Sequence, residues 1–394
     1  MQFTPLDQKM RAEWREMLRP ADGARLTAAA VLYLLSSLAL SLCRTETVAG
    51  LYLLYAVVFY YMLTHSLSAV VTISLPGVAL YGISVLIPSL PHPYLLPAVY
   101  AALILGGVGG GFLLLHCRER KYLPLLLLPV AAYAIAGAVT DPYTGLLVLI
   151  PAALSLVLGH GMLTCRPQTP VLITLAGVLA LSGLVFLLVW YACIGWPVAN
   201  PFAYIAELLR NGIFDLYRTA EQVYAEQGIT LGLSDTDIRN LSAVLGNILP
   251  GVFLSGCGVL SFVIFRTQLR VLTAWGTLAR VPVRIGAMTV SPLAAGLFVV
   301  AYLAGLIGGV GLFGTVCENL ALVLEPALIL VGVGALLVRD PKRHSGVSAF
   351  LLIGLVVLLL NYPGLALTFA AFVGAFRVLM AAFISARQKK DTSK

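Results

Sequence analysis

Charged side chains are scarce in this sequence. Asp, Glu, Lys and Arg make up 11% of its 394 residues, whereas hydrophobic residues make up 60%. Soluble domains average about 25% charged and about 45–50% apolar residues. So little charge cannot solvate a soluble exterior, and so much apolar surface cannot be hidden in one aqueous core. The composition therefore excludes an ordinary soluble protein and predicts a chain that is surrounded by lipid.

The motifs of several well-known chemistries are also missing. The sequence has no Walker motif, no HExxH and no GxSxG, and its 5 histidines are scattered. Its 6 cysteines stand singly, without a CxxC pair. We therefore expect no catalytic residues, no metal site and no cofactor, and the balance favours a protein that is not an enzyme. The net charge of +8 lies in short clusters between apolar runs, so we expect no nucleic-acid partner.

Long apolar runs recur along the whole chain. A helix needs about 20 mainly apolar residues to cross about 30 Å of hydrocarbon. Because lipid offers a backbone no hydrogen-bond partner, such runs must be helices. The sequence thus predicts an all-α fold, a polytopic transmembrane helical bundle of about 12 spans. The expected spans are near 25–43, 47–63, 66–88, 94–115, 121–138, 143–163, 170–194, 240–265, 288–311, 316–338, 347–361 and 364–386.

Basic residues are distributed unequally over the two sides of such a bundle. If the N-terminus is inside, twenty lysines and arginines fall on cytoplasmic segments, and only Arg44, Arg210, Arg218 and Arg239 fall on outer ones. Cytoplasmic loops of membrane proteins carry this kind of excess. We therefore expect a multi-pass protein of the cell (plasma) membrane whose N- and C-termini are both cytoplasmic.

The span pattern divides the chain into four parts. Residues 1–24 are predicted to be a cytoplasmic amphipathic segment, 25–194 a seven-span first membrane part, and 240–394 a five-span second membrane part. Between the two membrane parts, 195–239 is predicted to be an outer amphipathic loop.

Two interfacial helices are expected outside the spans. One lies within the outer loop and is entered through Pro197 and Pro201. The other covers 266–286, where leucines and a tryptophan oppose four arginines, and it is expected at the anionic inner surface. Glycine pairs spaced GxxxG, Gly107 with Gly111 and Gly305 with Gly309, predict close approach between spanning helices.

Few ionisable residues fall within the predicted spans. Glu325 and Arg377 lie mid-span, at similar depths when counted from the outer surface, and Glu318 lies on the same helix face as Glu325. A lone charge at the centre of a spanning helix costs at least about 2.5–3.5 kcal/mol. We therefore predict that Glu325 and Arg377 pair or share a water-filled cavity, either as a structural salt bridge or as part of a ligand-binding site. Pro326 favours a broken helix at this place.

Two stretches of the second half carry a resemblance to a known family. The segments 241–254 (LSAVLGNILPGVFL) and 371–377 (AFVGAFR) resemble the YybS-like family of predicted bacterial multi-pass membrane proteins, whose activity is unassigned. The first part of that family is similar to the substrate-binding component of energy-coupling-factor vitamin importers, in which AxxxA residues contact a coupling protein. Ala24 and Ala28 have this spacing here. The resemblance implies a small-molecule substrate and a cytoplasmic or membrane coupling partner, but it does not extend to the acidic loop 195–239.

Three functions compete at this level. Architecture and resemblance favour a multi-pass protein that binds or transports a small molecule near Glu325 and Arg377. One alternative is a membrane enzyme acting on lipid-linked sugars, similar to O-antigen polymerases or ligases, in which outer-loop arginines clamp a pyrophosphate. The other is a non-catalytic scaffold for envelope or sporulation partners.

Overall fold

A computed structural model of the chain covers most of the predicted membrane segments. It describes residues 23–42, 77–86, 95–116, 123–140, 142–164, 168–198, 200–225, 235–275, 290–309, 311–337, 354–355, 357–359 and 361–392. Within these ranges the chain forms helices joined by turns and short connections, and no strand occurs in them. The all-α prediction is confirmed.

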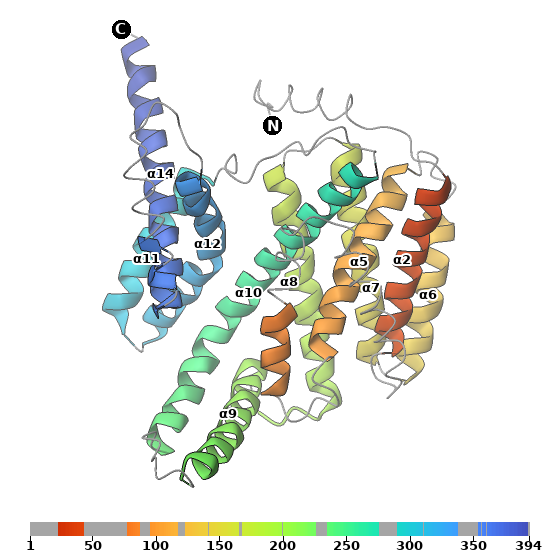
Figure 1. The fold of residues 1–394 in the computed structure, drawn as a ribbon, viewed down its shortest axis with the longest axis horizontal. Coiled ribbons are helices and arrows are strands. Elements are labelled where there is room, and N and C mark those ends of the chain that lie inside the picture. The colour runs from red at the N-terminus through yellow and green to blue at the C-terminus, as the bar shows by residue number, and fades with distance from the viewer. Residues whose placement is uncertain are drawn as a thin grey trace. The chain divides into compact units, whose positions relative to one another are not determined.

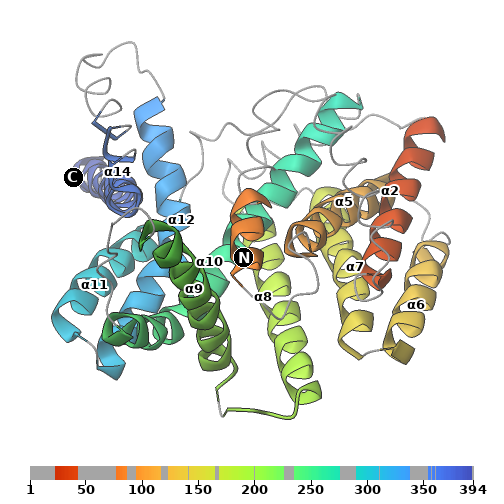
Figure 2. The ribbon, with the colours of Figure 1, turned by 60° about the horizontal axis from the view of Figure 1, so that its bottom comes forward.

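The helices follow one another along the chain as drawn in Figures 1 and 2. They are α2 (Gly23–Leu42), α5 (Leu95–His116), α6 (Leu123–Thr140), α7 (Pro142–Leu163), α8 (Gln168–Cys193), α9 (Pro201–Ala225), α10 (Asp235–Ala274), α11 (Pro292–Gly308), α12 (Leu312–Leu337) and α14 (Pro363–Thr392).

Seven of the described helices are long and apolar enough to cross a membrane, namely α2, α5, α7, α8, α10, α12 and α14. The helix α11, with 17 residues, and the apolar part of α6 are shorter. The predicted span 47–63, the larger parts of 66–88 and 347–361, and nearly all of the segment 1–24 lie outside the described residues. The described part of the chain thus supports seven spanning helices, and the predicted total of about 12 is not confirmed.

The chain packs as two compact units. Unit 1 comprises residues 1–247 and 260–280, and unit 2 comprises residues 248–259 and 281–394. The helix α10 therefore contributes residues to both units. The four-part division expected from the sequence stays a prediction.

The helix α5 forms the centre of unit 1. It packs against α2 and α7 (Figure 1), and most of its side chains are buried. Its glycines make this possible, because a Cβ added at Gly110 would collide with Ser155 of α7 and Tyr33 of α2. The prediction of close helix approach is confirmed for the glycine cluster at 106–111. In lipid, small residues of this kind let helix backbones come together.

The structure corrects the prediction of a separate interfacial helix over 266–286. Residues 266–274 continue α10, and the side chains of Leu269 and Leu272 are 0% exposed within unit 1. These leucines continue the buried face of the earlier part of α10, so residues 266–274 pack against protein instead of lying on the membrane surface. The remainder of the segment, from 276, is outside the described residues.

A buried glutamine ties this end of α10 to α5. With its amide oriented so that both polar atoms are satisfied, Gln268 donates to the carbonyl of Val108 at 2.8 Å and accepts from the backbone N–H of Phe112 at 3.2 Å. The buried amide is thus fully paired, as an apolar environment requires.

The predicted amphipathic helix of the loop 195–239 is confirmed as α9. It begins at Pro201, where Asn200 Oδ1 accepts a hydrogen bond from the backbone N–H of Phe202 at 2.9 Å and so caps the first turn. Its apolar face is covered in the first half of the helix: Ala206 and Gly212 are buried, and Ala206 lies against Gly246 of α10. That α9 lies along the outer membrane surface stays a prediction.

Aromatic side chains hold the turn between α8 and α9. The ring of Tyr191 contacts those of Trp196 and Tyr204, with centroids 5.2 and 5.7 Å apart. The Tyr191 hydroxyl accepts from the backbone N–H of Val198 at 2.8 Å. Trp196 has φ 52°, an uncommon value for a residue other than glycine. Tyrosine and tryptophan gather where spanning helices leave hydrocarbon, so this cluster marks the end of the α8 span.

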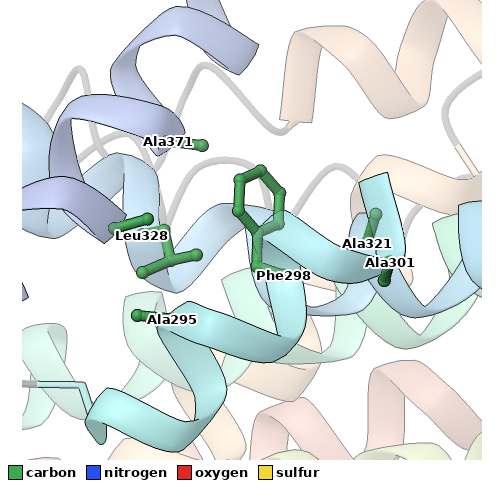
Figure 3. Packing of buried hydrophobic residues seen from close by; sticks show 7 residues of the cluster. Ala295, Phe298, Ala301, Ala321, Leu328 and Ala371 are labelled. Atoms are coloured by element: carbon green, nitrogen blue, oxygen red, sulfur yellow. The ribbon is translucent and has the colours of Figure 1, made fainter. Parts of the chain in front are cut away.

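Three helices form the core of unit 2. Both α11 and α14 pack on α12, and α11 also packs on α14. Phe298 of α11 lies among apolar side chains from all three helices (Figure 3). The buried cluster consists of Ala295, Phe298, Ala301, Ala321, Leu328, Ala371 and Ala375.

The helices α12 and α14 touch backbone to backbone and run in the same direction. A Cβ added at Gly374 would collide with the carbonyl oxygen of Leu328, and one added at Gly332 with that of Ala370. Since both helices run the same way, α12 ends and α14 begins at opposite ends of the pair. The predicted span 347–361 is consistent with this arrangement, because one crossing between α12 and α14 is needed if both helices run in the same direction.

We expect Gly110→Ala to lower the stability of the protein by about 1–3 kcal/mol, because the new methyl group overpacks the contact of α5 with Ser155 and Tyr33. The matched control is Gly177→Ala in α8, where a Cβ would meet nothing within 4 Å. The free energy of unfolding of both variants is measured by titrating the protein in mixed micelles with a denaturing detergent. Equal stability of the two would contradict the packing described for α5.

Candidate binding site around Glu325

Glu325 lies on the face of α12 that packs against other helices. The buried residues Ala321 and Leu328 belong to the unit 2 core and stand four and three positions from Glu325, on the same helix face. Glu325 itself is half-buried. Its carboxylate therefore points toward the contact with α14 instead of toward open lipid.

One neutral side chain is bonded to this carboxylate. Thr368 Oγ1 of α14 donates a hydrogen bond to Glu325 Oε1 at 3.0 Å. Among the residues that the structure describes, no lysine, arginine or histidine forms an ion pair with Glu325. The carboxylate thus has a hydrogen-bond donor and no opposite charge within this part of the chain.

The structure does not bring Arg377 to Glu325. Arg377 is nine residues beyond Thr368, which is about 13 Å along α14 and half a turn around it, and its side chain is exposed. The hydrogen bond places Thr368 of α14 level with Glu325 of α12, which is 43 positions earlier in the sequence. The first residue of α14 is therefore level with about residue 320 of α12, and not with Leu312, where α12 begins. Counting both residues inward from the helix starts therefore overestimated how close they are in depth. Their membership of one ligand-binding site stays a prediction.

Glu318 lies on the same face of α12 as Glu325, two turns earlier, and is exposed. The helix α11 approaches it closely, since a Cβ added at Gly305 would be 3.1 Å from Glu318 Cγ. Gly309, the predicted packing partner of Gly305, has a different role: its φ of 56° ends α11 in a conformation that favours glycine. Glu318 and Glu325 thus lie on one face of α12, and Thr368 of α14 is bonded to the second of them.

A second polar contact, which the sequence analysis did not include, joins α10 to α12 within unit 2. Pro250 has no N–H to continue the helix, and the N–H of the next residue, Gly251, donates to Asn319 Oδ1 at 2.5 Å. Asn319 Nδ2 in turn donates to the carbonyl of Thr315 at 2.8 Å. An asparagine one residue after Glu318 and a proline-glycine pair in the middle of a span were the available signals for this contact.

Pro326 does not break α12, which runs without interruption from Leu312 to Leu337. The expectation of a broken helix beside Glu325 is therefore wrong. A proline inside a helix nevertheless removes one backbone donor, so the carbonyl of Leu322, one turn earlier, lacks its usual partner within the helix.

The arginines of α9 bind within their own helix. Arg210 Nη2 contacts Glu207 Oε1 at 3.4 Å and Asn211 Oδ1 at 2.9 Å, and Arg218 lies over the ring of Phe214 at 4.2 Å. Neither therefore points to an anion site. Among the described residues, no group of three or more His, Cys, Asp or Glu side chains is placed to hold a metal ion.

These features define the class of protein: an all-helical, multi-pass membrane protein with a carboxylate between the helices of its second unit. Comparison with known proteins adds no relative, because no family model, no curated protein and no solved structure matches the chain.

We expect Asn319→Leu to destabilise the protein by about 1 kcal/mol, since it leaves the N–H of Gly251 without its acceptor inside a spanning segment. Asn361→Leu is the matched control, because Asn361 is exposed and its amide donates to the carbonyl of Val357 of the same segment at 2.8 Å. Unfolding curves of the two purified variants check this. A loss at Asn361 as large as that at Asn319 would contradict the role given to the interhelical bond.

Proposed function

We propose that this membrane protein binds or transports a small molecule at the Glu325 site, formed by Glu325, Thr368 and Glu318. One observation carries the proposal: a carboxylate in an apolar three-helix core has a neutral hydroxyl as its partner and no cation among the described residues. Ionisable residues inside membranes are costly and are kept mainly where they line a pathway or a binding site. A purely structural role would favour an opposite charge beside Glu325.

The helices around the site offer further support. Pro250 of α10 and Pro326 of α12, close to Asn319 and Glu325, each remove one backbone donor although both helices continue through them, so a backbone carbonyl near the site is left without its usual partner. We place the protein in the cell membrane with both termini in the cytoplasm, on the strength of its basic residues. A full count of about 12 spans, membership of the YybS-like family and a coupling partner belong to the same proposal.

The test is a binding screen on the full-length protein in lipid nanodiscs. The panel contains amino acids, amines, sugars, nucleosides and vitamins, and the readout is thermal unfolding. A ligand at a concentration about 100 times its Kd stabilises its protein by about 2.7 kcal/mol. We expect a stabilising shift for the wild-type protein and its loss in Glu325→Gln. The control Asp215→Asn, which changes an exposed carboxylate of α9, should keep the shift. The proposal fails if no compound shifts the wild-type transition, or if Glu325→Gln keeps every shift.

A further inference from the structure

We infer that the species bound by Glu325 is a small monovalent cation, either a proton or an alkali metal ion. This inference rests on the proposed function for the place of the site, and it adds the chemical class that the carboxylate takes. It follows from the charges on the elements that pack against Glu325 in unit 2.

Those elements bring no positive charge to the site. The only ionisable side chain of α11 is Tyr302, and that of residues 248–259 of α10 is Cys257. Along α14, the nearest basic residue is Arg377, half a turn away from Thr368 and about 13 Å along the helix. The other carboxylate of α12 on this face, Glu318, adds a second negative charge. Nothing in the described surroundings therefore balances an ionised Glu325.

An unbalanced charge of this kind is unstable in an apolar core. A hydroxyl donor satisfies one lone pair of the carboxylate but leaves its full charge, whereas a proton or a bound cation removes it. An anion would be repelled by Glu318 and Glu325, and a neutral solute would leave the charge as it is. The site thus favours a positively charged occupant.

The available ligand atoms suit a hard cation. The carboxylate of Glu325 and the hydroxyl of Thr368 are 3.0 Å apart, and both are oxygen ligands. The carbonyl of Leu322, which Pro326 leaves without its usual partner, is a third oxygen one turn away along α12. Oxygen donors of these kinds are the ligands of hard cations. For a proton, the step is the simple conversion of the carboxylate to the carboxylic acid, with no bond to carbon made or broken.

The experiment uses N,N′-dicyclohexylcarbodiimide on the full-length protein in liposomes. This apolar reagent adds to a protonated carboxyl group and gives a stable N-acylurea, which mass spectrometry locates in the sequence. We expect Glu325 to be labelled at least fivefold faster at pH 6 than at pH 9, while the exposed Asp215 of α9 stays unlabelled. Glu325→Gln should lose the label.

Two arms at constant ionic strength separate the cations. If sodium or potassium chloride slows the labelling several-fold relative to choline chloride, the occupant is an alkali ion. If neither salt protects and only pH matters, it is a proton. Thr368→Val should change the protection or the pH midpoint, and Thr368→Ser should restore it. These two variants keep the test valid if Glu325→Gln does not fold.

The inference is overturned if Glu325 in the folded protein is never labelled, or if its labelling rate changes with neither pH nor salt. These outcomes can be told apart from failure of the proposed function. Should the screen find no ligand while the labelling of Glu325 responds to pH or salt, the proposed function fails and the cation site stands. Should screen hits depend on Glu325 while its labelling responds to neither, this inference fails alone.

Discussion

Lipid hydrocarbon offers a polypeptide no hydrogen-bond partner, and the rest of this structure depends on that constraint. It makes every described span a helix, and it explains where several buried polar side chains bond. Gln268 bonds to backbone groups of α5, and Ser155 donates to the carbonyl of Pro151 within its own helix at 2.6 Å. Where Pro250 interrupts a ladder, Asn319 accepts the next N–H. Polar atoms in both units are thus used to complete helices.

The same solvent decides how the helices associate. Between helices in lipid there is little hydrophobic driving force, so close packing and a few interhelical hydrogen bonds must hold them together. Unit 1 achieves this around the glycine cluster of α5. Unit 2 uses Gly332 and Gly374, where α12 and α14 meet at backbone distance. Glycines, which have no Cβ, thus have the role at these contacts that large apolar side chains have in a soluble core.

Against this background Glu325 is the exception that points to function. The buried polar groups just described serve the backbone, but Glu325 is ionisable and bonds to another side chain, Thr368. Arg210 and Arg218 of α9, in contrast, are engaged along their own helix. The lack of positive charge among the described residues packed around Glu325 is therefore the strongest argument for a site that takes up a cation.

The sequence by itself determined which stretches are helices and where α9 begins, because hydropathy, amphipathic period and proline positions are local properties. It also singled out Glu325 as a costly charge. Only the tertiary structure decided that 266–274 continue α10 into a buried contact, and that Thr368, not Arg377, is level with Glu325. The reason is physical: the register between two helices is set by how their small and large side chains pack. Counting residues from the end of each apolar run cannot reveal it.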